Sequence, residues 1–336
     1  MQTELTKLTG IKYPIIMAPM FLVSNVAMMK AGLEAGVLSM FPTLNFRQED
    51  ELENVIDILQ QFKKEHAITD ADFGVNLIVQ KTNPLYERHL RICVEKKVMV
   101  FITSLGSPRV VIEEAHKYGG KVFCDVINME HAKKVYDLNC DGFIAVGQGA
   151  GGHAGPYPLS ILVPSLKKNF PDKPVIAAGG IANGHSICSM LAVGAAGVSI
   201  GTRFIASKEA GISDEYKNAV VNSHMSDIVL TERISGTPCT IINTPYAKRI
   251  GYKQNFFEKM MSKNNTTKKY FKMLVQLRGM KRLEAAIKPG NYDNLWCAGQ
   301  SVELIDDIQS CKHIIDQLVE ETKEAFEELS LKMSYI

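Results

Sequence analysis

His153 is the residue best suited by type and surroundings to proton transfer, because it lies in a glycine-rich segment, GQGAGGHAGP, at 147–156. An imidazole titrates close to neutral pH and can therefore act as a base or as an acid. The neighbouring glycines let a planar ring and a substrate approach the backbone closely. We predict that His153 is catalytic or contacts the substrate, with a structural histidine as the alternative. The other histidines fall on predicted helices, at helix starts or in connectors, and are not candidates.

Two more glycine-rich segments, AGGIANG at 178–184 and GTRF at 201–204, each follow an apolar run. Glycine N–H groups can approach phosphate oxygens closely, and the Thr202 hydroxyl and a helix N-terminus would add favourable contacts. These segments predict a phosphate-binding site at Gly179, Gly180, Gly201 and Thr202. Tight turns between strands and helices, without a ligand, are the alternative interpretation.

The segment at 147–152 also matches the pattern G-x-G-x-x-G of dinucleotide-binding proteins. That fingerprint should open a helix at once and be followed by an acidic residue about 20 positions later. Here HAGP follows instead, and the next strand ends in AAGG. We therefore reject a dinucleotide-binding fold and interpret the segment as part of an active-site loop.

Other predicted strands also end in residues that suit a flat cofactor. The first ends in MAPM at 17–20, a rigid turn that could line the face of such a ring, and the third ends in GVNL at 74–77, which includes Asn76. An asparagine amide can offer both a donor and an acceptor to a flavin pyrimidine edge. Ser104 and Gln148 are further polar candidates, whereas Asp125 could equally cap the next helix. No lysine ends a strand, so Schiff-base chemistry is not supported.

These residues must be positioned by a repeating pattern that runs from residue 13 to about 205, in which short apolar runs alternate with amphipathic stretches. Such alternation is typical of βα units. The predicted strands are 14–17, 37–40, 73–77, 98–103, 121–126, 142–146, 174–177 and 197–200, and the predicted helices lie near 25–35, 48–65, 84–96, 109–118, 129–138, 160–169 and 185–193.

Eight parallel strands in a chain of this size favour closure into a (β/α)8 barrel, the TIM barrel of the α/β class. An active site then lies at the carboxyl ends of the strands, and the last two loops commonly hold a phosphate. A doubly wound open sheet is the alternative fold.

After residue 205 the pattern changes to predicted helices at 214–222, 256–263, 268–286 and 302–331. The segment 238–252 is rich in Thr, Pro and Asn, and we expect an irregular crossing or lid there. We therefore predict a cofactor-binding barrel over 1–210, a smaller and mainly helical lobe or lid over 211–300, and a C-terminal helix over 301–336 that packs back on the barrel.

The composition is that of an ordinary globular protein, with 336 residues, 46% hydrophobic and 22% charged residues and a formal net charge of +2. The basic residues are spread along the chain, which does not indicate nucleic-acid binding. No apolar run reaches the roughly 18–20 residues of a membrane helix, and no leader is recognisable, so we expect a cytoplasmic protein. The 7 cysteines are scattered without a C-x-x-C pair, and we expect neither a metal site nor a disulfide framework.

Five segments occur in order along the chain, YPIIMAPM at 13–20, GVNL at 74–77, GGHAG at 151–155, AGGI at 178–181 and GAAGVSIGTRF at 194–204. Together they resemble the nitronate monooxygenases, formerly called 2-nitropropane dioxygenases. The resemblance implies an FMN-dependent barrel with a smaller helical domain, in which an alkyl nitronate and O₂ yield a carbonyl compound and nitrite. His153 would deprotonate a neutral nitroalkane or orient the bound anion. The implied FMN contacts are Ala18, Pro19, Met20, Asn76, Gln148, Gly151, Gly180, Gly201 and Thr202. We also predict that Gly152 and Gly179, in the same glycine-rich segments, bind the cofactor.

The same superfamily includes flavin-dependent enoyl-ACP reductases and an NADH:quinone reductase group. Typical nitronate monooxygenases carry Q-G-x-E-A-G-G-H before the loop, where this chain has VGQGAGGH at 146–153. An NAD(P)H-dependent reductase of an enoyl thioester or a quinone is therefore the alternative activity. A barrel that binds FMN without turnover and a non-flavin phosphate-site barrel also stay open. The expected partners are a small-molecule substrate and O₂, with NAD(P)H for the reductase, and a homodimer is compatible with the sequence.

Overall fold

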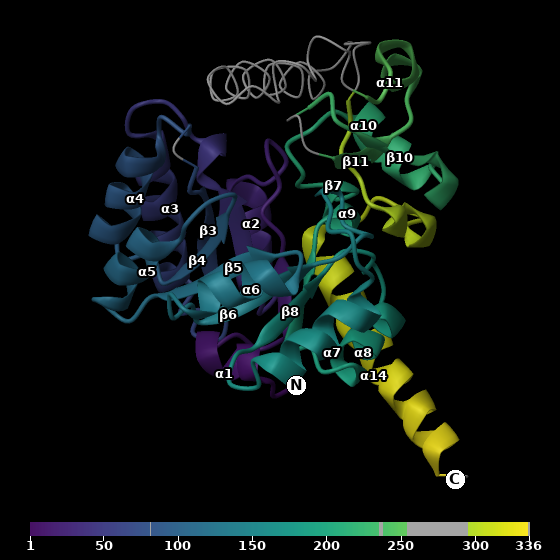
Figure 1. Ribbon diagram of the computed structural model, residues 1–336, viewed down its shortest axis with the longest axis horizontal. Coiled ribbons are helices and arrows are strands. Elements are labelled where there is room, and N and C mark those ends of the chain that lie inside the picture. Colours follow the sequence, from purple (N-terminus) through teal and green to yellow (C-terminus); the bar gives the residue numbers. More distant parts are fainter. Residues whose placement is uncertain (81, 235–237, 254–294, 335–336) are drawn as a thin grey trace.

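The computed structural model describes residues 1–80, 82–234, 238–253 and 295–334, shown in Figure 1. The predicted helices at 256–263 and 268–286 lie outside these residues. Eight parallel strands close into a barrel, in which the first strand pairs with the last. The predicted TIM barrel is therefore confirmed. Its strands are β1 (Ile15–Met17), β2 (Leu38–Pro42), β3 (Asp72–Ile78), β4 (Val100–Ser104), β5 (Lys121–Val126), β6 (Gly142–Val146), β8 (Val175–Ala178) and β9 (Gly197–Ile200).

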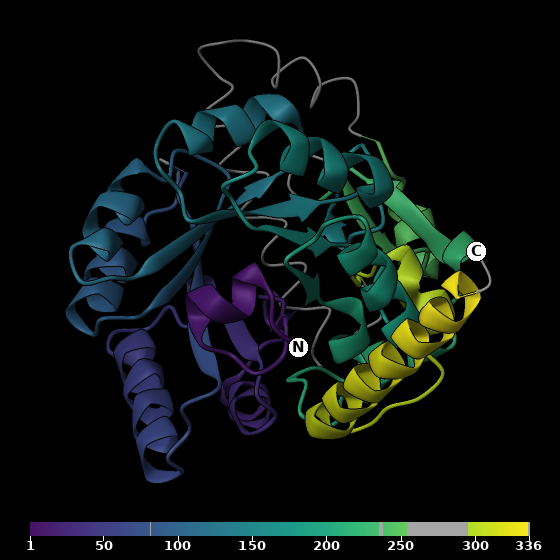
Figure 2. The same ribbon diagram turned by 90° about the horizontal axis from the view of Figure 1, so that it is seen from below.

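Helices follow the strands and surround the barrel, as Figure 2 shows. Asparagine side chains cap three of them, because Asn25, Asn128 and Asn183 each accept a backbone N–H from the first turn of the helix that follows. The helices of the barrel are α2 (Val26–Glu34), α3 (Glu51–Glu65), α4 (Tyr86–Glu95), α5 (Arg109–His116), α6 (Met129–Tyr136), α7 (Leu159–Asn169), α8 (Gly184–Ala192) and the short α9 (Thr202–Ile205), with a 3₁₀ turn, η1 (Thr43–Asn45), after β2.

A short helix that the sequence analysis did not predict, α1 (Glu4–Thr9), precedes the barrel. Its Leu5 is fully buried and belongs to the same apolar cluster as Ile16, Ile102 and Phe123 from the barrel strands. A Cβ added at Gly197 would lie 2.5 Å from Leu5 Cδ2. The helix therefore covers the amino-terminal end of the barrel and leaves the carboxyl-terminal end for a site.

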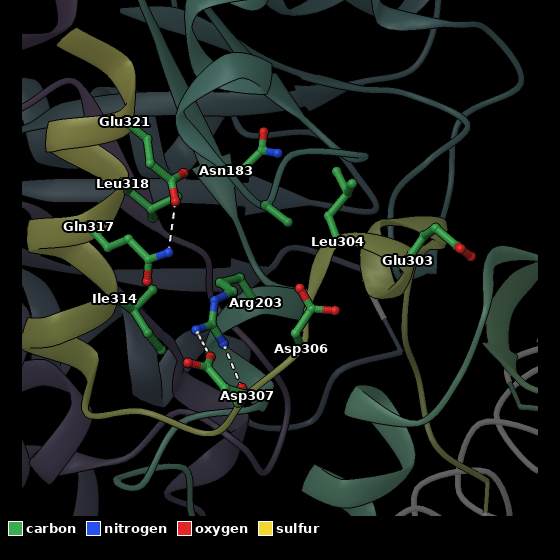
Figure 3. Close-up of a pocket in the computed structure, with 11 residues that line it drawn as sticks. Asn183, Arg203, Glu303, Leu304, Asp306, Asp307, Ile314, Gln317, Leu318 and Glu321 are labelled. Atoms are coloured by element: carbon green, nitrogen blue, oxygen red, sulfur yellow. Dashed lines mark hydrogen bonds and ion pairs between the residues drawn. The ribbon is translucent and has the colours of Figure 1, made fainter. Parts of the chain in front are cut away.

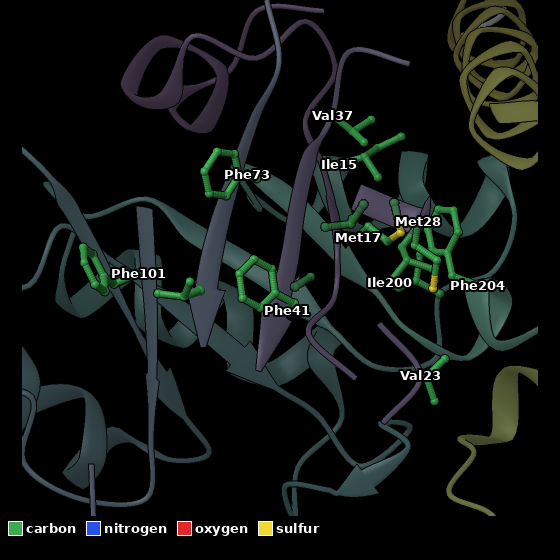
Figure 4. Packing of buried hydrophobic residues seen from close by; sticks show 14 of the residues in the cluster. Ile15, Met17, Val23, Met28, Val37, Phe41, Phe73, Phe101, Ile200 and Phe204 are labelled. Carbon is green, nitrogen blue, oxygen red and sulfur yellow. The ribbon is translucent and has the colours of Figure 1, made fainter. Parts of the chain in front are cut away.

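The core has two layers because side chains alternate along each strand. One cluster fills the barrel interior, and a second, larger cluster lies between the strands and the surrounding helices. Figure 4 shows this outer cluster, to which β2, β3 and β4 contribute Phe41, Phe73 and Phe101. This alternation determines which residues at the carboxyl ends of the strands face inward.

The lobe after the barrel contains a small antiparallel sheet as well as helices. Its central strand, β11 (Cys239–Ile242), pairs with β10 (Ile228–Thr231) on one side and with β7 (Gly152–His153) on the other. The segment 238–252 is thus a strand followed by a helix, and the prediction of an irregular crossing is wrong. A strand of four residues gives little periodic signal, and its partners are remote in sequence. The other lobe elements are α10 (Asp214–Val221), η2 (Met225–Asp227) and α11 (Pro245–Ile250).

The predicted helix at 302–331 is wrong at its start. The chain forms a 3₁₀ helix, η3 (Gln300–Leu304), then an extended stretch, and the last helix is α14 (Cys311–Met333). Ser310 caps α14 by accepting the His313 N–H, which fixes the start of the helix. The helix packs on the barrel wall beside α8, where the Gly184 N–H donates to Glu321 Oε2 over 2.8 Å. Within the described ranges, no helix is long and apolar enough to cross a membrane.

Candidate active site at the carboxyl-terminal end of the barrel

One half of the barrel opening is polar, because β3, β4 and β5 each carry a polar side chain that faces inward at or near their carboxyl ends. Asn76 pairs in register with Ile102, which lies in the interior cluster. Ser104 and Asp125 follow the interior residues Ile102 and Phe123 by two positions and so share their face of the sheet. The register therefore brings three polar side chains of neighbouring strands together.

These three side chains are connected by hydrogen bonds. Asn76 Nδ2 donates to Ser104 Oγ over 2.8 Å and to the Ile102 carbonyl over 3.2 Å. Ser104 Oγ donates in turn to Asp125 Oδ2 over 2.5 Å. Burial raises the pKa of Asp125 to about 6, and the hydrogen bond from Ser104 opposes that rise. Asp125 does not cap the next helix, because Asn128 does so, and that interpretation is wrong.

The opposite half of the opening consists of glycines, and the close packing around some of them leaves no room for a larger residue. Gly179 has a φ of 115°, and a Cβ there would lie 2.6 Å from the backbone N of Ala150. The Gly180 N–H donates to the Gly149 carbonyl over 3.0 Å. The predicted phosphate contact from this N–H therefore has a competitor inside the protein. What Gly180 leaves for a ligand is the space beside its α-carbon, where a Cβ would contact only Gly149 Cα, at 3.9 Å.

Gly201 differs from these glycines because the fold does not require it. Its φ is −112°, and a Cβ there would lie 3.7 Å from both Ala18 Cβ and Met20 Sδ, which is ordinary van der Waals contact. Thr202 Oγ1 accepts the Gly299 N–H over 3.1 Å, which leaves the hydroxyl proton available for a further acceptor. Gly201 and Thr202 thus combine room for a further atom with an available donor.

The two helix N-termini near the predicted phosphate site are not equivalent. That of α8 already binds the Glu321 carboxylate through the Gly184 N–H. A second anion there would be repelled, so α8 does not supply the favourable helix dipole that the sequence suggested. The N-terminus of α9, beside Gly201, is the one that bears no such carboxylate among the contacts of the described residues.

His153 lies in β7, and the lobe holds its backbone in place. Cys239 and Thr240 of β11 pair with His153 and Gly152. Thr240 Oγ1 also donates its single proton mainly to the Ala150 carbonyl at 2.5 Å, with the Gly152 carbonyl as a second, more distant acceptor at 3.3 Å. His153 is exposed to solvent, yet enough protein surrounds the ring that desolvation lowers its pKa below the usual 6.5. Its imidazole is therefore mainly neutral at pH 7 and able to accept a proton.

The loop at 147–156 contains three further predicted cofactor contacts, Gln148, Gly151 and Gly152, and each has a different structural environment. Gln148 is exposed, and its backbone N–H donates to the Tyr157 carbonyl over 2.9 Å. A Cβ at Gly151 would lie 2.9 Å from the backbone N of Gly299, so close packing requires a glycine there. Gly152 has a φ of 72°, and a Cβ there would meet nothing within 4 Å.

Asn45 is a site residue that the sequence analysis missed. Its Oδ1 accepts the Leu22 N–H over 2.9 Å, and its Nδ2 donates to the carbonyls of Met20 over 3.3 Å and Ser24 over 2.8 Å. These bonds shape the loop that follows β1, in which Leu22 has a left-handed φ of 63°. The predicted contacts Ala18, Pro19 and Met20 all lie in this loop, half-buried. A polar residue just after a strand was the only available signal for Asn45.

A separate polar cavity of about 270 Å³ lies between α8, α9, η3 and α14 (Figure 3). Arg203 is buried beside it, and its Nη1 and Nη2 donate to the Asp307 carbonyl over 3.1 Å and to Asp307 Oδ1 over 2.6 Å. Arg203 thus anchors the stretch between η3 and α14 to the barrel. Among the described residues no group of His, Cys, Asp and Glu is arranged to hold a metal ion.

Fold and site together define a (β/α)8-barrel enzyme whose polar side chains and glycine loops gather at the carboxyl ends of the strands. The sequence model of the nitronate monooxygenase family matches residues 82–321. The chain belongs to that family, which confirms the resemblance, and it is an oxidoreductase of a family of flavin enzymes.

The similarity to known proteins extends over both the barrel and the lobe of this chain. A probable nitronate monooxygenase of Staphylococcus saprophyticus is 30% identical over 96% of this chain and 98% of the relative. The (3aS,4S,5R,7aS)-5-hydroxy-7a-methyl-1-oxo-octahydro-1H-indene-4-carboxyl-CoA dehydrogenase of Rhodococcus jostii is 27% identical over 95% of each chain. Among solved structures, FabK from Thermotoga maritima aligns with a TM-score of 0.83 and 31% identity over 100% of both chains.

Proposed function

We propose that this protein is an FMN-dependent nitronate monooxygenase that converts an alkyl nitronate and O₂ into a carbonyl compound and nitrite. The observation that carries the proposal is the exposed, mainly neutral imidazole of His153, on a strand that continues the glycine loop of a barrel of this family. A neutral imidazole is the form that can remove a proton from the carbon beside a nitro group.

The residues at the barrel opening fit FMN. A Cβ at Gly201 or at Gly180 would meet no clash, so each glycine leaves room for a ligand atom, and Thr202 with its hydroxyl directly follows Gly201. We assign these residues to the phosphate and its attached chain. Asn76, on the polar half, is assigned to the pyrimidine edge, and the loop with Ala18, Pro19 and Met20 to the flat face. Bound FMN would supply the electron transfer between nitronate and O₂ for which side chains have no equivalent.

The protein's own contribution is positioning and proton transfer. His153 would take the proton of a neutral nitroalkane or fix the charge of a nitronate that arrives already ionised. Thr240 orients the loop through its bonds to the carbonyls of Ala150 and Gly152. Gln148 and Gly151 are assigned to cofactor contact because they lie in the same loop.

The proposal is tested on the anaerobic purified protein, by adding ethylnitronate and NADH separately while the flavin absorption near roughly 450 nm is followed. Bleaching by ethylnitronate, followed by nitrite release when O₂ is admitted, is the expected result. A colourless protein that cannot be reconstituted with FMN would refute the cofactor assignment.

His153→Asn tests the role of the imidazole. The variant should keep FMN and lose roughly 10²–10⁴-fold in rate on neutral nitroethane, the usual contribution of a general base. On preformed ethylnitronate it should lose far less. His131→Asn, on the exposed side of α6, is the matched control and should leave both rates unchanged. Equal losses of His153→Asn on both substrates would remove the base assignment.

The reductase remains a second candidate, and two observations favour it. The relative from Rhodococcus jostii is named a dehydrogenase of a CoA thioester and matches over 95% of each chain. The loop at 146–153 also has no Glu where typical nitronate monooxygenases carry one. Bleaching of the flavin by NADH, with none by ethylnitronate, would establish this candidate in place of the first.

A further inference from the structure

Ser104 and Asp125 have no assigned role in the proposed function, yet they connect directly to Asn76. The three residues come from adjacent strands, β3, β4 and β5, and the hydrogen bonds run in one direction from Asn76 to Ser104 to Asp125. Asn76 is buried, with 8% of its surface exposed, whereas Ser104 and Asp125 are half-buried. A chain of this kind can fix the orientation of its terminal member.

The direction of the bonds follows from the charge at Asp125. Its pKa of about 6 leaves the carboxyl mainly ionised at pH 7, and an ionised carboxylate can only accept hydrogen bonds. Ser104 must therefore donate its single proton to Asp125, so that its oxygen can only accept from Asn76. A hydroxyl that had its proton free could bond the asparagine in either orientation.

The orientation of the Asn76 amide is thereby determined. Both protons of Nδ2 are used, one by Ser104 Oγ at 2.8 Å and one by the Ile102 carbonyl at 3.2 Å. Oδ1 accepts no hydrogen bond from any of the residues that the structure describes. It is also not among the fully buried polar atoms that lack a partner, so it is accessible.

We propose that Ser104 and Asp125 are positioning residues that hold the Asn76 amide with Oδ1 toward the ligand, so that the barrel selects a ring bearing an N–H at this edge. This inference rests on the proposed flavin site, where N3–H of the pyrimidine ring is the group of that kind. An inverted amide would present N–H groups instead and would favour a ligand carbonyl.

The test compares FMN with N3-methyl-FMN, which lacks the N3–H donor, for binding to the full-length protein freed of flavin. Quenching of flavin fluorescence gives the dissociation constant of each. The wild type should bind FMN about 10-fold or more tightly than the methylated flavin, since it gains a hydrogen bond and avoids a steric contact. Ser104→Ala should weaken FMN binding by roughly 3- to 10-fold and narrow the preference.

Conservative and control variants separate positioning from general damage. Ser104→Thr retains the hydroxyl and should restore the preference for FMN. Asp125→Asn retains an acceptor oxygen, but its amide can also donate, so that Ser104 no longer has to donate its proton to residue 125. The preference for FMN over N3-methyl-FMN should therefore narrow partly. Thr103→Val deletes the neighbouring hydroxyl of β4, which donates to Cys124 Sγ and not to Asn76, and it should leave the preference intact.

Each outcome bears on the inference. An unchanged preference in Ser104→Ala would overturn the positioning role while leaving the flavin site in place. Equal binding of both flavins by the wild type would overturn the recognition of N3–H. Failure of the wild type to bind either flavin would overturn the proposed flavin site and this inference together.

Discussion

Gly201→Ala tests whether Gly201 borders the cofactor, because an alanine at this position should weaken FMN binding much more than it changes the stability of the fold. A Cβ at this position would lie 3.7 Å from Ala18 Cβ and Met20 Sδ and 3.8 Å from Met20 Cγ, so the protein can accommodate it. The φ of −112° carries no left-handed strain. We expect the free energy of unfolding to change by less than about 1 kcal/mol, with reduced freedom of the unfolded chain acting in favour of alanine.

FMN binding should respond differently, because the added methyl group takes space that we assign to the cofactor. We expect the dissociation constant of FMN to rise by roughly 10-fold or more, equivalent to about 1.4 kcal/mol or more. Fluorescence titration with FMN and urea unfolding of the flavin-free protein measure the two quantities separately.

Gly179→Ala is the matched comparison. Its φ of 115° and the 2.6 Å approach of a Cβ to Ala150 N predict strain of ~1–3 kcal/mol from the backbone alone, with steric crowding in addition. This variant should lose stability first and FMN affinity only as a consequence. If Gly201→Ala binds FMN as tightly as the wild type does, Gly201 does not border the cofactor. The assignment of FMN to glycines at which a Cβ would meet no clash is then refuted.

Three further predictions concern residues that the sequence analysis did not assign to the site. Thr240→Val removes the bond to the Ala150 carbonyl, and the rate on neutral nitroethane should fall roughly 10-fold with FMN affinity nearly unchanged, as one lost hydrogen bond implies. Asn45→Asp loses two donors to the loop after β1, and FMN affinity should fall roughly 10-fold in a fluorescence titration; unchanged affinity would count against this loop as a cofactor contact. Burial lowers the pKa of His89 to about 4 and leaves it neutral in the folded state, so the unfolded state binds its proton first as the pH falls below 6.5. Urea unfolding should therefore show about 2 kcal/mol less stability at pH 5 than at pH 7 from this residue, a loss that His89→Leu abolishes.

The barrel could be predicted because each of its units carries its own signal. A buried parallel strand appears as a short apolar run, and an amphipathic helix follows it with an asparagine cap, as at Asn128 and Asn183. The lobe could not be predicted in the same way. β7 has 2 residues and β11 has 4, and each is stabilised by a partner far away in the sequence rather than by its own pattern.

The residues of the candidate site also differ in whether a local sequence pattern could reveal them. Asn76 and Gly201 could be proposed because they lie near or just after the carboxyl ends of barrel strands, where any barrel builds its site. The roles of Asn45 and Thr240 depend on hydrogen bonds to residues 23 and 90 positions away, and no local pattern encodes such pairs. The link between Ser104 and Asp125 required the strand register, which joins residues 21 positions apart.

The candidate site lies partly on the barrel and partly on the lobe, so a structural change in one part can leave the other intact. The residues assigned to FMN lie on barrel loops, whereas β11 of the lobe holds the His153 strand. The stretch 295–299 connects the two, because the Trp296 carbonyl accepts the Ile242 N–H over 2.8 Å and the Gly299 N–H reaches Thr202 over 3.1 Å. Damage to β11 alone should therefore uncouple the histidine from a cofactor that still binds, whereas damage at 295–299 should affect both together. Cofactor retention without proton transfer is then the expected signature of a fault in the lobe.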